Sequence, residues 1–333
     1  MEDLKKENPY GLVYDNAITE NADGKVNIKP VNYMLNGLKI SANLYLPANY
    51  DENKKYSAVA VAHPNGGVKE QVAGLYAQKL AELGYVTIAA DASYQGASEG
   101  EPRLRDYPSN RIDDISGMID YLIKMESVDN SKIGALGICG GGGYTLACSQ
   151  TDKRIKAVAT LSMFNSGRVR RNGFLDKQKD TIQERLIKSA NARNKELEGE
   201  IAYEGFLPDM NDEELTKYMD SLPEGLYKDG IYYYGLRYRN PKSTGSYTTA
   251  SFIKLMAFDV EDRMDLINQS LLMIAGSNAD TLYMTKDAFE KATGTENKEL
   301  YLVEGATHIQ TYWKEEYVEK VVNKLKDFFG ENL

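Results

Sequence analysis

Short apolar segments that alternate with helical patterns constrain the fold of this chain more than any other feature. The segments are nearly continuous in hydrophobic residues, which is typical of strands buried on both faces of a sheet. They cover residues 57–63, 85–91, 132–138, 155–164, 270–276 and 299–305. Helical patterns lie between them, at residues 71–84, 111–125, 142–150, 285–293 and 315–330. Strands that alternate with helices predict an α/β fold with a mostly parallel, doubly wound sheet.

The N-terminal part departs from this rhythm. Residues 26–36 and 39–46 alternate apolar and polar positions around the turn-forming pair Asn36 and Gly37. This pattern predicts an antiparallel hairpin at one edge of the sheet.

A second departure sets the predicted domain organisation. Residues 165–265 carry charged helical patterns and a tyrosine-rich segment, but no apolar segment of the buried-strand type. A connection of that length in a compact domain needs structure of its own. We therefore expect an inserted helical cap at 165–265, over the carboxyl edge of the sheet, between two parts of one core at 1–164 and 266–333.

Composition and charge exclude several classes of function. A net charge of -9 argues against nucleic-acid binding, which needs a basic face. No apolar run approaches the roughly 20 residues that cross a bilayer, and the first residues lack a secretory pattern, so we expect no membrane partner and a cytoplasmic location. The 2 cysteines show no metal-ligand spacing, and we expect neither a metal nor a cofactor. The sequence leaves open whether the protein forms a homodimer.

The stretch IGALGICGGGGYTLAC, residues 133–148, places a cysteine among glycines between a predicted strand and a predicted helix. This is the arrangement of a G-x-S-x-G nucleophile elbow, with Cys139 as the nucleophile and Gly137 and Gly141 at the outer positions. We expect the N–H of Gly140 to face a developing oxyanion, and the helix N-terminus to favour the thiolate of Cys139. The alternatives are a small buried cysteine or a phosphate-binding turn, although no G-K-[ST] follows.

A cysteine nucleophile needs a base, and the chain has only 2 histidines. His308 follows the last predicted strand, at the same edge as Cys139, and we expect it to be the base. His63, which ends the first long strand and precedes Pro64, is expected to be structural. Asp280 follows the strand at 270–276, and we prefer it as the acid that orients His308, because the order nucleophile, acid, histidine then matches that of α/β hydrolases. Rival carboxylates precede that strand, at positions 259, 261, 262 and 265.

The turn after His63 is the expected source of a second oxyanion donor. Pro64 has no N–H, so the candidates are the amides of Asn65 and Gly66. The alternative is an ordinary tight turn.

Residues that would bind substrate are harder to choose. Candidates are Tyr94 in the loop after residues 85–91, Tyr233 in the tyrosine-rich segment, and an anion site at Arg168 with its neighbours Arg170 and Arg171. The competing interpretation is that these side chains pack the cap or are solvated.

With these features the chain resembles the dienelactone-hydrolase-like group of α/β hydrolases. The resemblance covers nearly the whole core and includes AHPNGGVKEQ, DASYQGASEGEPR, GALGICGGGGY and ATHIQTY. It implies an α/β-hydrolase fold and a cysteine in a G-x-C-x-G elbow, followed by an aspartate and a histidine, here Cys139, Asp280 and His308. Small dienelactone hydrolases lack the segment 165–265, so their substrate is not carried over.

The predicted function is hydrolysis of an ester, lactone or thioester of a small molecule through a thioester acyl-enzyme. An acyltransferase or acyl-peptidase would use the same residues. A ligand-binding or redox-sensing protein without turnover is a third, less favoured class.

Overall fold

A central sheet of eight strands organises the computed structural model, which describes residues 8–333. Its order is β1-β2-β4-β3-β5-β6-β9-β10, and every pair from β4 to β10 is parallel, whereas β1 with β2 and β2 with β4 are antiparallel. The strands are β1 (Asn27–Leu35), β2 (Leu38–Leu46), β3 (Tyr56–Ala62), β4 (Val86–Ala90), β5 (Val128–Ile138), β6 (Ala157–Leu161), β9 (Ser270–Gly276) and β10 (Lys298–Val303). The apolar segments of the sequence therefore became the strands that they predict.

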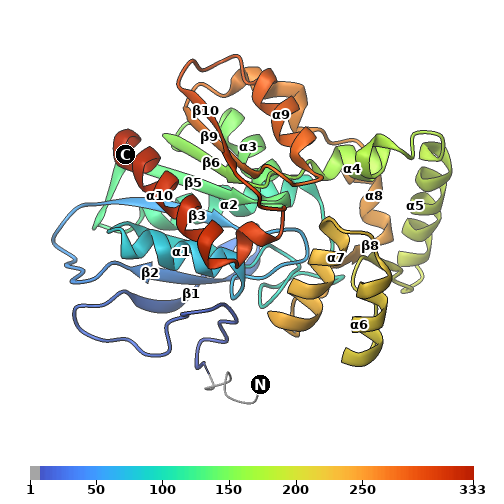
Figure 1. The fold of residues 1–333 in the computed structure, drawn as a ribbon, viewed down its shortest axis with the longest axis horizontal. Coiled ribbons are helices and arrows are strands. Elements are labelled where there is room, and N and C mark those ends of the chain that lie inside the picture. The colour runs from blue at the N-terminus through green and yellow to red at the C-terminus, as the bar shows by residue number, and fades with distance from the viewer. Residues whose placement is uncertain (1–7) are drawn as a thin grey trace.

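Helices cover both faces of this sheet (Figure 1). On one face α1 (Val72–Glu82) and α10 (Glu315–Asn332) pack in one hydrophobic cluster, and on the other α2 (Pro108–Ile123), α3 (Gly140–Thr151) and α9 (Leu282–Lys291) pack in a second. Each strand of the middle of the sheet contributes alternate side chains to the two clusters, which explains why its sequence is apolar throughout. No helix among residues 8–333 is long and apolar enough to span a membrane.

The predicted N-terminal hairpin forms the edge of the sheet. Leu35 pairs with Leu38 in the antiparallel register of β1 and β2. Asn36 and Gly37 make the turn between them with φ values of 49° and 80°. Two successive positive φ values are the requirement of a type I′ turn, and asparagine followed by glycine meets it at low cost.

Between β6 and β9 the chain leaves the sheet and forms a separate layer beside the carboxyl ends of the strands (Figure 1). Its helices are α4 (Ser166–Asn172), α5 (Ile182–Glu196), α6 (Asp212–Ser221), α7 (Leu226–Gly230) and α8 (Phe252–Leu255), with a π-helical turn at Ile231–Arg237. It also holds a small antiparallel ladder of β7 (Tyr203–Gly205) and β8 (Ser246–Thr248), which the prediction of a purely helical cap missed. Strands of three residues leave no apolar run to detect.

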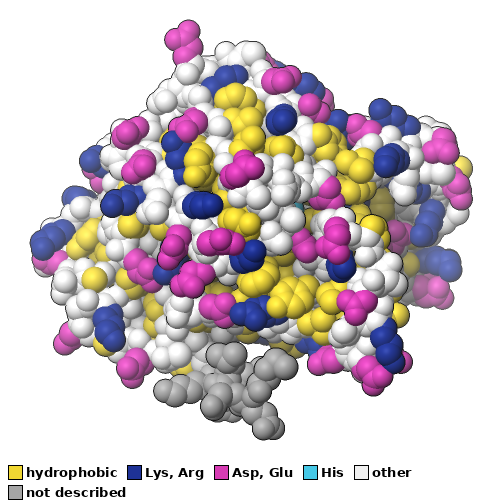
Figure 2. Space-filling model, viewed as in Figure 1, with side chains coloured by type: hydrophobic (Ala, Val, Ile, Leu, Met, Phe, Trp, Pro, Cys, Tyr) yellow, Lys and Arg dark blue, Asp and Glu magenta, His cyan; other side chains and the backbone are white. Residues whose placement is uncertain are grey.

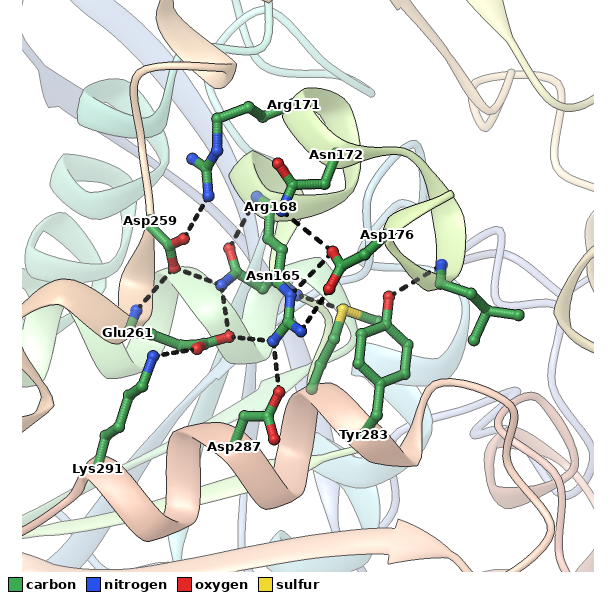
Figure 3. Close-up of polar contacts among 12 residues, drawn as sticks. Asn165, Arg168, Arg171, Asn172, Asp176, Asp259, Glu261, Tyr283, Asp287 and Lys291 are labelled. Atoms are coloured by element: carbon green, nitrogen blue, oxygen red, sulfur yellow. Dashed lines mark hydrogen bonds and ion pairs between the residues drawn. The ribbon is translucent and has the colours of Figure 1, made fainter. Parts of the chain in front are cut away.

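A network of charged side chains ties the start of this insertion to its end and to α9 (Figure 3). Arg168 of α4 contacts Glu261 at 2.9 Å, Asp176 at 2.7 Å and Asp287 of α9 at 2.6 Å. The amide of Asn165 donates to Asp259 at 2.6 Å and to Glu261 at 3.1 Å. Because the Arg168 side chain is only 14% exposed, these contacts lie in a partly dehydrated environment where they are screened less than surface pairs.

Removing the centre of this network is expected to destabilise the fold. Arg168→Met should lower the free energy of unfolding by roughly 2 to 4 kcal/mol, because Glu261 would lose one of its cationic partners in a nearly buried position. Urea-induced unfolding measures this change. Arg263→Met is the matched control, since Arg263 pairs with Asp265 on the surface and its loss should change the same free energy by less than about 0.5 kcal/mol. Equal effects of the two variants would contradict the prediction.

Candidate active site

Cys139 lies at the tip of a sharp turn between β5 and α3. Its φ of 55° and ψ of -122° belong to a strained region that non-glycine residues rarely occupy. Hydrogen bonds hold the backbone there. Its N–H donates to the carbonyl of Leu161 at 2.9 Å, and its own carbonyl accepts from Phe164 at 2.9 Å and from Gly142 at 2.8 Å. The strain is therefore imposed by the neighbouring strand β6 and the residues that follow it.

Glycines beside this turn allow the strand and the helix to approach closely. A Cβ atom on Gly141 would lie 2.5 Å from the carbonyl oxygen of His63, and one on Gly137 would lie 2.5 Å from the carbonyl oxygen of Gly141. Both separations are shorter than side-chain carbons adopt. The two outer positions of the G-x-C-x-G motif are thus glycine for steric reasons.

Two backbone amides face the sulfur of Cys139. The N–H groups of Gly140 and Asn65 lie close enough to Sγ to hydrogen-bond to a thiolate and lower its pKa. Gly66, the other predicted donor, has a φ of 67°. It packs so tightly against Gly245 of the insertion that a Cβ added to Gly66 would lie 2.6 Å from the Cα of Gly245. The described contacts therefore favour Asn65 over Gly66 as the second donor.

His308 is buried next to this turn and is held between two hydroxyl groups. Its Nε2 lies 2.8 Å from the hydroxyl of Tyr312, and its Nδ1 lies 2.6 Å from the hydroxyl of Thr281. Burial raises the pKa of Cys139, and the nearby Tyr312 hydroxyl opposes this shift. The hydroxyl of Tyr312 thus contacts the imidazole and lies near the sulfur.

The structure does not pair Asp280 with His308. Its Oδ2 accepts a hydrogen bond from the backbone N–H of Leu226, at the start of α7, at 2.9 Å. Within residues 8–333 neither ring nitrogen of His308 bonds to a carboxylate. The cause lies in the loop after β9, where Thr281 is the residue that immediately precedes α9 and directs its hydroxyl to His308, while Asp280 faces the insertion.

Burial dominates the charge states of the site. It raises the pKa of Cys139 by more than Tyr312, Gly140 and Asn65 lower it. Burial also lowers the pKa of His308 to about 3, so the imidazole is neutral near pH 7. Burial therefore opposes the resting thiolate that we expected at the helix N-terminus, and the pKa of the thiol is raised.

Cys139 opens into a cavity of about 780 Å³ between the core and the insertion. Figure 2 shows hydrophobic side chains in a recess between these two parts of the molecule. Most of the lining is apolar or aromatic, and the insertion supplies much of it, including Phe206, Tyr227 and Tyr234. This shape and lining suit an acyl group with a large apolar part.

Among the described residues that line this cavity, Arg170 is the one with a cationic side chain. Its guanidinium stacks on the ring of Tyr247 at 4.4 Å, and its buried Nε has no hydrogen-bond partner among residues 8–333. Two carboxylates, of Glu224 and Asp280, line the same cavity.

The residues predicted to bind substrate lie elsewhere. The Arg168 side chain is paired with the carboxylates of Asp176, Glu261 and Asp287. Tyr233 is buried in the core against Tyr312, with 5.5 Å between the ring centroids. Tyr94 ties its own loop together, since its N–H donates to Glu99 and its carbonyl accepts from Leu104, both at 2.8 Å. The lining residues of the cavity include none of the three. Substrate-binding roles for them are therefore not supported.

His63 is a structural imidazole, as predicted. Its Nδ1 lies 2.7 Å from the carbonyl of Pro64, and its Nε2 accepts from the N–H of Ala92 at 3.0 Å. Both ring nitrogens are occupied and the ring is buried. Among residues 8–333, no group of three His, Cys, Asp or Glu side chains is arranged to hold a metal ion.

Sequence reasoning missed Tyr312 and Thr281. The spacing of four residues between His308 and Tyr312 was a usable signal, because one helical turn places such residues on one side. Nothing in the sequence distinguished the hydroxyl of Thr281 from the adjacent carboxylate of Asp280.

Comparison with known proteins relates the chain to hydrolases. Residues 40–162 match the model of the dienelactone hydrolase family. The chain is 39% identical over 299 residues to the uncharacterised protein YcjY of Escherichia coli, an alignment that covers 89% of this chain and 95% of that protein. It is also 33% identical over 305 residues to the uncharacterised protein PA2218 of Pseudomonas aeruginosa, covering 89% of this chain and 78% of the relative.

Solved structures support the α/β-hydrolase fold. The crystal structure of PA2218 superposes with a TM-score of 0.81 at 31% identity, covering 93% of this chain and 95% of that one. The structure of GrgF from a Penicillium species, described as an α/β hydrolase, has a TM-score of 0.73 at 19% identity, covering 92% of this chain and 99% of that one. The predicted fold class is confirmed.

The buried state of His308 predicts a dependence of stability on pH. Its pKa is about 3 in the folded protein against 6.5 ordinarily, so at intermediate pH the unfolded chain binds a proton that the folded protein does not. The wild type should therefore lose unfolding free energy relative to His308→Gln as the pH falls. This difference should decrease by roughly 1 kcal/mol per pH unit between about pH 6 and pH 4. Chemical denaturation across this range measures it. An advantage that is independent of pH would contradict a buried, neutral imidazole.

Proposed function

Because the chain belongs to the dienelactone hydrolase family, we propose that it is a hydrolase that uses Cys139 as its nucleophile on an ester, lactone or thioester. The observation that carries this proposal is the position of the Cys139 thiol. It lies on a strained turn, opens into the cavity, and faces the amides of Asn65 and Gly140. A thiol at such a point can attack a carbonyl carbon, and the two amides can stabilise the oxyanion that results.

In the proposed acylation step His308 accepts the proton of Cys139. The sulfur forms a bond to the carbonyl carbon, and the tetrahedral oxyanion rests on the two amides. The bond from this carbon to the leaving oxygen or sulfur then breaks, and the proton held on His308 passes to the leaving group. Thr281, which contacts Nδ1 of His308, orients the ring in place of a carboxylate.

In the second step water replaces the leaving group. His308 takes a proton from the water while the water oxygen attacks the thioester carbonyl. Breakdown of the intermediate returns the proton to sulfur and releases the carboxylic acid. Esters, lactones and thioesters suit this site better than amides, because an amine leaves only after strong protonation.

An acyltransferase is the second candidate. The curated relative grgF of a Penicillium species, which is 23% identical over 256 residues, is named a polyketide transferase. Such an enzyme would form the same acyl-cysteine and pass the acyl group to an alcohol or amine. Product analysis with and without an added acceptor separates the two functions.

The test of the proposed function is intact mass spectrometry after mixing the protein with p-nitrophenyl esters of short and aromatic acids. The wild type should form an acyl adduct that decays, because the thioester is hydrolysed. His308→Ala should form the adduct at least about 100-fold more slowly, since it lacks the base. Cys139→Ala should form none. Equal release of p-nitrophenolate by Cys139→Ala and the wild type would remove Cys139 from the mechanism.

The cavity also predicts a preference among acyl groups. Arg170 should favour an acyl chain that carries a carboxylate at its far end, because a charged hydrogen bond at a dehydrated site contributes about 1.5 to 3 kcal/mol. Arg170→Met should therefore lower kcat/KM for the p-nitrophenyl monoester of adipic acid by roughly 10- to 100-fold relative to p-nitrophenyl hexanoate. Steady-state release of p-nitrophenolate gives both values.

The matched control is Arg171→Met. Arg171 pairs with Asp259 at 2.6 Å and does not line the cavity, so its loss should leave the ratio of the two kcat/KM values unchanged. A ratio that Arg170→Met also leaves unchanged would show that Arg170 does not recognise the acyl group.

A further inference from the structure

The hydroxyl of Tyr312 lies beside both His308 and Cys139. It is 2.8 Å from Nε2 of His308, and Tyr312 lines the same cavity as Cys139, near enough to the thiol to favour its thiolate form. Within the described chain, the partner of Nε2 is this hydroxyl and not the sulfur. A proton that leaves Cys139 for His308 therefore meets the oxygen of Tyr312 first.

We propose that Tyr312 is a catalytic residue that relays the proton between Cys139 and His308; this inference rests on the proposed function. As the sulfur attacks, the S–H bond breaks and its proton moves to the oxygen of Tyr312. In the same step the original O–H proton of Tyr312 moves to Nε2 of His308. The products are a bond from sulfur to carbon, an oxyanion on the former carbonyl oxygen, a neutral tyrosine and an imidazolium, so protons and charge balance.

The position of Tyr312 is fixed by its surroundings. The side chain is buried and packs edge to face against Tyr233, with 5.5 Å between ring centroids and 84° between planes. Its neighbour Thr311 is bonded on both sides, because its hydroxyl donates to the carbonyl of His308 at 2.7 Å and its carbonyl accepts from Tyr76 at 2.6 Å. The hydroxyl cannot leave the path between Cys139 and His308 without disturbing this packing.

The hydrogen-bond chain can operate in both directions. Hydroxyls contact both nitrogens of His308, and a hydroxyl can either donate or accept. Before transfer, Tyr312 donates to Nε2 and accepts from the thiol, while Nδ1–H donates to Thr281. After transfer, Nε2–H donates to Tyr312, which in turn donates toward the sulfur. The same chain can thus return the proton during breakdown of the acyl-enzyme.

The charges of the site require this transfer to accompany the attack. Burial raises the pKa of Cys139, raises the pKa of Tyr312 well above its ordinary value and lowers the pKa of His308. A resting pair of thiolate and imidazolium is therefore disfavoured, and so is a tyrosinate intermediate. Movement of both protons in one step avoids each of these species.

The first test is the proton inventory of wild-type acylation, measured as the burst of p-nitrophenolate release in mixtures of H2O and D2O. Two protons in transfer give a downward-curved dependence on the fraction of deuterium, and a straight line, which one transferring proton gives, would overturn the relay. This measurement needs no variant, so it holds even if substitution of Tyr312 impairs folding.

The second test is Tyr312→Phe, which keeps the ring and removes the hydroxyl. Burst acylation should fall by about 100-fold or more, and His308→Gln combined with it should add little, because residues that act as one unit are not additive. Tyr233→Phe is the matched control, since it removes a neighbouring buried hydroxyl outside the cavity and should leave the burst rate near that of the wild type. A burst rate of Tyr312→Phe within about threefold of the wild type would overturn the proposal.

A third test needs no substrate and separates this inference from the proposed function. The rate at which iodoacetamide alkylates Cys139 is measured against pH by intact mass. Tyr312→Phe should shift the midpoint to higher pH, because the thiolate loses a hydrogen-bond donor, whereas Tyr233→Phe should not; an unshifted midpoint argues against the contact. If Cys139→Ala still hydrolyses esters at the wild-type rate, the proposed function fails whatever the midpoint is.

Discussion

The site depends on the strained backbone of Cys139, which β6 and the residues after it hold in place between β5 and α3. A positive φ at this residue costs about 1 to 3 kcal/mol, and the bonds to Leu161, Phe164 and Gly142 oppose its relaxation. Relaxation would move the sulfur away from the amides of Gly140 and Asn65. The glycines of the motif follow from the same constraint, because a side chain at Gly141 would collide with the end of β3.

Dehydration decides the chemistry of the sulfur. A helix N-terminus stabilises a negative charge by about 0.3 to 1 kcal/mol at an exposed site, whereas full burial shifts a pKa by as much as 3 to 5 units, or about 4 to 7 kcal/mol. At Cys139 burial raises the pKa by more than the neighbouring hydrogen-bond donors lower it, and the thiol is the resting form. In the mechanism that we propose, the thiolate must then be generated during the reaction, which is why the position of Tyr312 near both the sulfur and His308 matters.

The sequence predicts the parts of this molecule that follow a regular pattern. Six apolar segments located six strands of the sheet, the alternating hairpin pattern located the other two, and the order of Cys139 and His308 placed both at one edge of the sheet. The sequence did not predict the contacts of Asp280, because a shift of one residue in the loop after β9 decides whether a carboxylate or the hydroxyl of Thr281 contacts the imidazole. The sequence did not predict the burial of Tyr233, because this residue lies in a π-helical turn. There the N–H of Tyr238 donates to the carbonyl of Tyr233, five residues earlier, and side chains leave the ordinary helical faces.

The insertion and the site form one hydrogen-bonded unit. The turn after β3 is bonded to it through Asn65 and Ser166 at 2.8 Å, and through Gly66 and Ser243 at 2.7 Å. The loops after β9 and β10 are bonded to α7, through Asp280 and Leu226 and through Thr307 and Asp229. The three loops that carry Asn65, Thr281 and His308 therefore also hold the insertion. Rigid movement of the insertion would break bonds at the oxyanion donors and beside His308 together, so substrate binding in the cavity and the geometry of the proposed chemistry are coupled.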